Sequence, residues 1–195
     1  MVKALIRSCV TCSRLRGQPC EQKMADLPHD RLCPSPPFLY CACDLFGPFL
    51  VKAGRYKVKR YAVIFTCLSS RSVHLEPVFS LSSDSFFNAF RRLVSVRGPV
   101  QELRCDQGTN LMGSRNELLK MGCELKPNPP KSSHRGGAWE RMIGSARRVI
   151  EGILMEHSSH IDDEGFATLL FEAASVVNSR PLSVENIGDP QTLGP

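Results

Sequence analysis

The sequence predicts an α/β domain with five strands, on the evidence of hydrophobic periodicity and of one break in composition. Three runs of β-branched, aromatic and aliphatic residues between positions 38 and 78 predict a three-stranded meander. Beyond it, segments with apolar residues three and four apart alternate with short apolar runs, which is typical of helices and strands in turn. Residues 1–37 differ in composition from the rest of the chain because they are rich in proline and basic residues. This difference predicts a separate segment that ends in a linker.

The meander accounts for the first three strands, expected over residues 38–51, 58–68 and 72–78, with Gly54 in the first turn. A helix over residues 84–96 is expected next, because its apolar residues recur at helical spacing. Ser82 and Ser83 precede that helix as N-cap candidates, and Gly98 with Pro99 ends it.

The second half of the chain predicts two further strands and three further helices. From Ala138 the apolar residues recur at three and four, which is the clearest helical pattern in the chain. The last helix begins near Asp162 and ends at Asn178, before Pro181. The other expected elements are a strand over 100–105, a helix over 113–121, a strand over 123–126 and an irregular loop over 127–137.

The composition fits a globular domain and excludes several classes of protein. Of 195 residues, 42% are hydrophobic and 23% charged, which excludes a disordered chain. No apolar run approaches the roughly 20 residues that cross a bilayer, and the N-terminus has no signal-peptide pattern, so no membrane partner is expected. The net charge is +6, and residues 1–60 hold 11 Lys and Arg against four Asp and Glu. Such a basic front suits a polyanion, although many proteins that bind none are as basic.

The chain has nine cysteines and no secretory signal, which indicates thiols in a reducing compartment. Four of them lie in or beside apolar strand-like runs, where a cysteine is usually a small hydrophobic filler: Cys41, Cys43, Cys67 and Cys105.

Three carboxylates occupy positions where a charge is costly unless a cation or a donor compensates it. Asp44 lies inside the first strand, Asp106 lies where the fourth strand ends, and Glu140 lies in the first turn of the helix from Ala138. Two carboxylates on adjacent strands and a third on a helix crossing the sheet can converge on hard divalent cations, which suit phosphate chemistry.

Each of these residues also has a plain structural interpretation. Asp44 can cap a turn before Gly47, Asp106 can form an Asx turn with Gly108, and Glu140 can simply favour a helix N-terminus. Taken together and in this order of elements, the three positions favour the shared site.

Three sequence blocks then carry a family resemblance. The blocks 43–48 (CDLFGP), 105–110 (CDQGTN) and 136–141 (GGAWER) resemble the integrase core of LTR retrotransposons, with the BEL/Pao type as the closest match. The resemblance covers about residues 38–180, and the 33 residues between Asp106 and Glu140 give a spacing similar to that of retroviral integrases.

The resemblance implies an RNase H-like fold, with a mixed five-stranded sheet flanked by helices. It implies that Asp44, Asp106 and Glu140 are both the catalytic residues and the ligands of Mg²⁺ or Mn²⁺. The implied reactions are metal-dependent processing of DNA 3′ ends and strand transfer, with DNA ends and a target duplex as partners. A homo-oligomer and a nuclear location are expected with them.

Basic and polar residues near the three acids are the candidate DNA contacts. Each of the arginines and the lysine can equally be a solvated surface residue, and Asn110 can equally stabilise the turn at Gly108. Trp139 falls on the apolar stripe and is expected in the core. The candidate contacts are Asn110, Lys131, Arg135, Arg141, Arg147 and Arg148.

The expected domains are residues 1–37, 38–185 and 186–195: a truncated remnant of a zinc-binding module with a linker, the integrase core, and a tail. Cys9 and Cys12 match the cysteine half of that module, but the histidine pair would precede Met1, so zinc is not expected. The alternative ligands that could complete such a site are Cys20, His29 and Cys33. Two other functions stay open: a nuclease that only hydrolyses DNA, and an inactive element-derived module that binds nucleic acid or protein.

Overall fold

The structure is a computed structural model, and it describes most of the chain. For residues 109–110, 133–138 and 156 it describes the backbone and not the side chains. The described residues are 9–11, 34–106, 108–128, 133–156 and 161–180.

The described residues confirm the expected α/β class. Apart from a short helical turn at residues 10–11, the elements are, in chain order, β1 Tyr40–Ala53, β2 Tyr56–Cys67, β3 Val73–Val78, α4 Ser83–Arg97, β4 Glu102–Cys105, α5 Thr109–Gly113, α6 Arg115–Lys120, β5 Glu124–Pro127, α7 Ser133–Glu156 and α8 Asp163–Asn178.

The five strands form one mixed sheet in the order β3-β2-β1-β4-β5. The meander pairs antiparallel, whereas β4 pairs parallel with β1 and β5 pairs parallel with β4. The central strand β1 thus joins the antiparallel and parallel halves.

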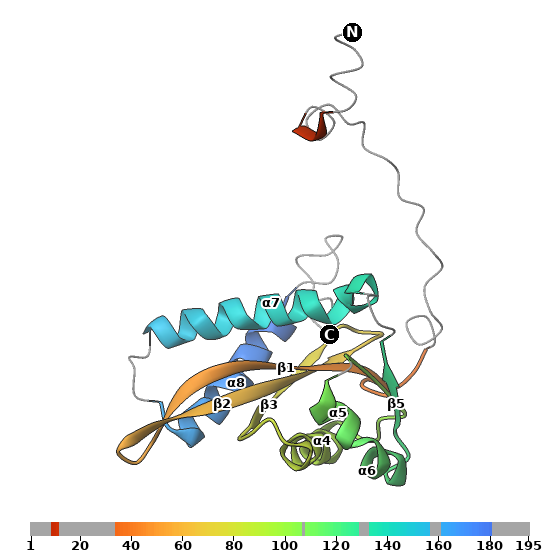
Figure 1. Cartoon of the computed structure of the whole chain (residues 1–195), viewed down its shortest axis with the longest axis horizontal. Coiled ribbons are helices and arrows are strands. Elements are labelled where there is room, and N and C mark those ends of the chain that lie inside the picture. The colour runs from red at the N-terminus through yellow and green to blue at the C-terminus, as the bar shows by residue number, and fades with distance from the viewer. Residues whose placement is uncertain (1–8, 12–33, 107, 129–132, 157–160, 181–195) are drawn as a thin grey trace.

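Helices cover both faces of this sheet (Figure 1). On one face α4, α5 and α6 pack over a core that includes Cys43, Phe65 and Leu103. On the other, α7 and α8 pack over Ala42 and Phe46, among others. Because side chains alternate along a strand, successive residues of β1 face opposite helical layers.

The long helix after the meander begins as its sequence predicts. The side chain of Ser82 accepts a hydrogen bond from the backbone N–H of Ser85, and Gly98 follows the last residue with φ of 92°. A serine cap and a glycine that tolerates positive φ therefore set the two ends of α4.

The expected helix over 113–121 is confirmed as α6, which is slightly shorter at both ends. A further short helix, α5, was not expected; it lies before α6 and meets it at Ser114. The Ser114 hydroxyl donates to the Ser83 carbonyl at 3.0 Å, and a Cβ at Gly113 would clash with the Ser83 side chain. This contact with the start of α4 favours a corner over a continuous helix.

The expected start of the long helix near its tryptophan is wrong. α7 begins at Ser133, so residues 133–137, expected in a loop, are helical. Glu140 consequently lies about two turns into α7 and not in its first turn. Trp139 is fully buried, as its place on the apolar stripe predicts.

The end of α8 forms hydrogen bonds with the backbone of the edge strand β3. Asn178, at the end of α8, accepts from the backbone N–H of Val73 and donates to its carbonyl, both at 2.8 Å. These backbone groups lie on the outer edge of β3, where no other strand of the described residues pairs. One amide side chain thus satisfies both backbone groups of Val73 at the start of this strand edge.

The four strand cysteines are buried, as expected of apolar fillers. Within the part of the chain that the structure describes, no helix is long and apolar enough to cross a membrane.

Candidate active site

Asp44 is a half-buried acid in the middle of the central strand β1. It pairs with Ile64 of β2, and its Oδ1 accepts a hydrogen bond from the backbone N–H of Leu45 at 2.8 Å. It shares the sheet face of Ala42 and Phe46, which α7 covers.

Asp106 lies next to Asp44 because of the parallel strand pairing. Cys43 of β1 pairs with Cys105, the last residue of β4, so the two acids directly follow paired residues. Adjacent strands lie about 5 Å apart, which places the two backbones at that separation where the acids begin. The expectation that Asp44 is inside a strand and Asp106 at a strand end is confirmed.

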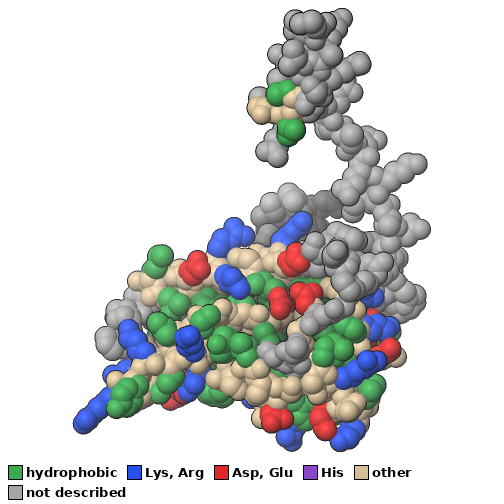
Figure 2. Space-filling view, in the orientation of Figure 1, with side chains coloured by type: hydrophobic (Ala, Val, Ile, Leu, Met, Phe, Trp, Pro, Cys, Tyr) green, Lys and Arg blue, Asp and Glu red, His purple; other side chains and the backbone are tan. Residues whose placement is uncertain are grey.

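Glu140 reaches this region from α7. Its side chain is exposed, and it makes no hydrogen bond or ion pair with any described residue. The neighbouring Trp139 is fully buried and anchors this part of the helix to the sheet. Figure 2 shows acidic side chains gathered where the first half of α7 lies over the sheet.

The pKa of Asp44 is raised, and the charges of the other two acids contribute to the rise. Burial raises that pKa from 3.8 to about 6, and the hydrogen bond from Leu45 opposes the rise. The charges of Asp106 and Glu140 raise it further, whereas the charge of Arg147 lowers it. Carboxylates on β1, at the end of β4 and on α7 therefore interact, and the site favours a positive charge among them.

The residues fit a hard divalent cation by chemistry and charge. They offer only carboxylate oxygens, the ligands that Mg²⁺ prefers, and their mutual repulsion is what a cation relieves. As the side chains stand, however, no three His, Cys, Asp or Glu among the described residues converge closely enough to hold an ion. The exposed, unpaired side chain of Glu140 is the group free to turn toward the other two.

Arg147 is the basic residue that lies beside the acids. It is exposed, its guanidinium carbon lies 5.6 Å from the centre of the Phe46 ring, and its charge acts on Asp44. Arg141 and Arg148 are also exposed on α7, and the Nε of Arg148 donates to the Gly144 carbonyl. α7 therefore presents arginines next to the carboxylates.

Other expected site residues lie outside the described part of the structure. Lys131 and the zinc candidates Cys12, Cys20, His29 and Cys33 are among them, as is the expected tail at 186–195. The backbones of Asn110 and Arg135 are helical, but their side chains are not described.

Asn128 is a residue of this region that the sequence analysis missed. Its side-chain amide donates to Oδ1 of Asp106 at 3.1 Å, and the residue is buried. Its position directly after the fifth strand was the available signal, since the ends of adjacent parallel strands meet at one edge of a sheet.

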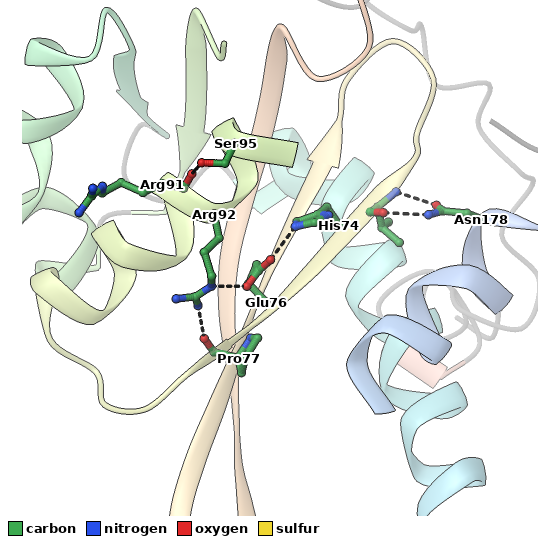
Figure 3. Close-up of polar contacts among 8 residues, drawn as sticks. His74, Glu76, Pro77, Arg91, Arg92, Ser95 and Asn178 are labelled. Atoms are coloured by element: carbon green, nitrogen blue, oxygen red, sulfur yellow. Dashed lines mark hydrogen bonds and ion pairs between the residues drawn. The ribbon is translucent and has the colours of Figure 1, made fainter. Parts of the chain in front are cut away.

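A second polar cluster links β3 to α4 and was also missed. Glu76 accepts from His74 Nε2 at 2.9 Å and from Arg92 Nε at 2.6 Å, while Arg92 also donates to the Pro77 carbonyl (Figure 3). His74 and Glu76 are both buried and share one strand face. The hydrogen bonds satisfy all three side chains, which is typical of a structural ion network.

Comparison with known proteins defines the fold. No protein-family model and no curated protein matches the chain. Among solved structures it is similar to a chain of the simian T-cell lymphotropic virus intasome in complex with PP2A regulatory subunit B56 gamma, determined by electron cryomicroscopy. The TM-score is 0.64 at 14% identity, over 94% of this chain. The present chain covers 63% of the length of that neighbour.

This likeness shows an integrase-like fold. Together with the mixed five-stranded sheet and its two helical layers, it confirms the RNase H-like class that the three sequence blocks imply. The BEL/Pao affiliation stays a prediction.

Proposed function

We propose that this chain is the catalytic core of a BEL/Pao-type integrase, which processes DNA 3′ ends and transfers them to a target duplex. The observation that carries the proposal is the electrostatic contact of Asp44 with Asp106 and Glu140 in an integrase-like fold. Three acids carried by one strand, by the end of its neighbour and by a helix, and close enough to act on one another electrostatically, suit phosphodiester chemistry.

The three carboxylates would hold Mg²⁺ or Mn²⁺, with no zinc required. Bound there, the metal supplies Lewis-acid activation of the attacking oxygen and charge stabilisation of the leaving one. The chain itself binds and orients the DNA strand, and the nucleophile is water or a DNA 3′-hydroxyl. No cysteine or serine needs to form a covalent intermediate.

Arg147 would bind a phosphate next to the reacting group. Its guanidinium lies over the Phe46 ring, and its charge acts on the carboxylate of Asp44. Arg141 and Arg148 would bind phosphates further along α7, with Asn110, Lys131 and Arg135 completing the contact surface. DNA ends, a target duplex and further copies of the chain are the proposed partners, in the nucleus.

The test is a joining assay with a labelled duplex carrying recessed 3′ ends and a plasmid target, in Mg²⁺ or Mn²⁺. Wild type should give joined product, and Glu140→Gln should abolish it. Glu151→Gln is the matched control, because this exposed acid lies about three turns further along the same helix. Cleavage without joining would indicate a nuclease.

A second candidate function is an inactive module that binds nucleic acid or protein. The observation that favours it is the lack, among the described residues, of three side chains already arranged to hold an ion. Duplex binding without cleavage or joining in either metal would support this candidate and overturn the enzyme.

A further inference from the structure

We infer that Asn128 is a positioning residue for Asp106: its buried amide holds the carboxylate in the orientation in which that carboxylate binds the metal. The inference rests on the proposed function, because it assigns Asp106 to the metal site. It adds a residue that carries no charge and that follows β5, whereas Asp44 lies in β1 and Asp106 follows β4.

The backbone fixes where Asn128 stands. It directly follows β5, whose last residue Pro127 pairs with Cys105 of β4. The backbone N–H of Asn128 donates to the Cys105 carbonyl at 2.8 Å, so the strand pairing continues to the residue before Asp106. The position of Asn128 relative to Asp106 is thereby set by main-chain hydrogen bonds and does not depend on its own side chain.

The side chains of the two residues differ in freedom. Asp106 is exposed and lies beyond the end of its strand, so its own surroundings restrict it little. Asn128 is only 8% exposed, so its amide has already lost most of its rotational freedom through packing. The 3.1 Å hydrogen bond from the amide to Oδ1 of Asp106 therefore restricts the rotation of the exposed Asp106 side chain, because the Asn128 side chain that donates it is itself fixed by packing.

The chemistry of an amide suits this task. Its N–H group stabilises the ionised carboxylate, yet it adds no charge that would compete with a cation or repel the other acids. Oδ2 of Asp106 accepts no hydrogen bond from a described residue and stays available as a ligand. Carboxylates that bind metals are themselves commonly held by hydrogen bonds, and losing such a partner costs about 10- to 100-fold in affinity or activity.

The experiment measures Mn²⁺ affinity of the full chain by calorimetry, for wild type and three variants. Asn128→Leu keeps the number and branching of the side-chain heavy atoms but removes the donor, whereas Asn128→Gln keeps an amide donor on a longer stem. Lys126→Met is the matched control: it breaks the 2.6 Å pair with Glu102 between the same two strands without touching Asp106. We expect the Mn²⁺ Kd to rise about tenfold or more in Asn128→Leu, less in Asn128→Gln, and not in Lys126→Met.

A metal-free measurement separates this inference from the function. In a double-mutant cycle of Asn128→Leu and Asp106→Ala, each of which removes the hydrogen bond, urea unfolding should show coupling of about fivefold in the unfolding constant. An unchanged Kd in Asn128→Leu, equal losses in the Leu and Gln variants, or absent coupling would each overturn the inference while leaving the proposed function standing. Failure of the wild type to bind Mn²⁺ would overturn both.

Discussion

Arg60 of β2 and Asp163 in the first turn of α8, 103 residues apart in sequence, form a two-pronged ion pair. The Nε and one terminal nitrogen of the guanidinium donate to the two carboxylate oxygens at 2.7 and 2.9 Å. The same guanidinium lies 4.9 Å from the centre of the Phe79 ring. One arginine thus links the meander to the start of the last helix.

Breaking this pair should cost a modest amount of stability. Asp163 is 39% exposed, so solvent screening limits the pair to about 0.5–1 kcal/mol, and Arg60→Met should lose slightly more than Asp163→Asn because it also loses the ring contact. Urea unfolding measures both. The control is Glu164→Gln, an exposed acid in the same turn with no described partner. Equal losses in all three variants would contradict a specific pair.

The cluster around Glu76 should make stability fall in acid. Burial raises the pKa of Glu76, but the hydrogen bonds from His74 and Arg92 outweigh burial and bring the net pKa below 4.5. The ionised group therefore stabilises the fold above about pH 4.5, and this stability is lost as the pH falls through the lowered pKa.

The variant Glu76→Gln tests that acid dependence. It should lose about 2 kcal/mol near neutral pH, since it leaves Arg92 and His74 without their anion, and its deficit should shrink below about pH 4.5. Unfolding free energies at several pH values give the comparison. A deficit that stays constant down to about pH 3 would show that packing and not charge is responsible.

Asp44→Asn should stabilise the metal-free protein while removing joining activity. Because the pKa of Asp44 is raised to about 6, the charged form costs stability above that pH, and the cost disappears as the pH falls toward 3.8. After allowance for partial exposure, the gain should be about 1–2 kcal/mol near pH 8 and close to zero near pH 4. Urea unfolding in EDTA measures it, and a loss of stability near pH 8 would contradict the assignment.

Four buried thiols with raised pKa values should resist alkylation in the folded protein. Burial raises the pKa of Cys105 and of Cys123 to about 12, and it raises that of Cys41 and Cys43 as well. Iodoacetamide near pH 8 should leave these four unmodified, because the thiolate is the reacting form. Peptide mass spectrometry should find all nine cysteines modified in urea. Half-buried Cys9 is the reference, and rapid native labelling of Cys105 would contradict the buried position.

The elements that local signals define could be predicted from sequence. Alternating apolar runs defined the meander, and a serine or aspartate cap marked the starts of α4 and α8. The corner at Ser114 could not be predicted, because its hydroxyl donates the hydrogen bond that favours the corner to the carbonyl of Ser83, 31 residues away in sequence. Nor could the start of α7, since the glycines at 136 and 137 argue locally against a helix.

In the candidate site, too, the residues that could be predicted are those with a local sequence signal, and the others depend on contacts between distant elements. Asp44 and Asp106 were found because acids at a strand centre and a strand end conflict with the surrounding apolar pattern. Asn128 does not conflict with its local sequence pattern, because an asparagine after a strand is common. It lies beside Asp106 only because β4 and β5 pair in parallel register. The cluster of His74 and Glu76 likewise depends on Arg92 arriving from another element.

The amide of Asn178 on the backbone of Val73 has a consequence for synthesis on the ribosome. The meander ends 85 residues before α8 begins, so the outer edge of β3 and the apolar face beneath α8 have no cover while those residues are synthesised. Open strand edges and exposed apolar faces recruit other chains. A nascent or proteolysed chain that ends before α8 is therefore the aggregation-prone form of this protein. Once α8 has formed, it covers the apolar face and the start of the β3 edge, and other chains can no longer pair there.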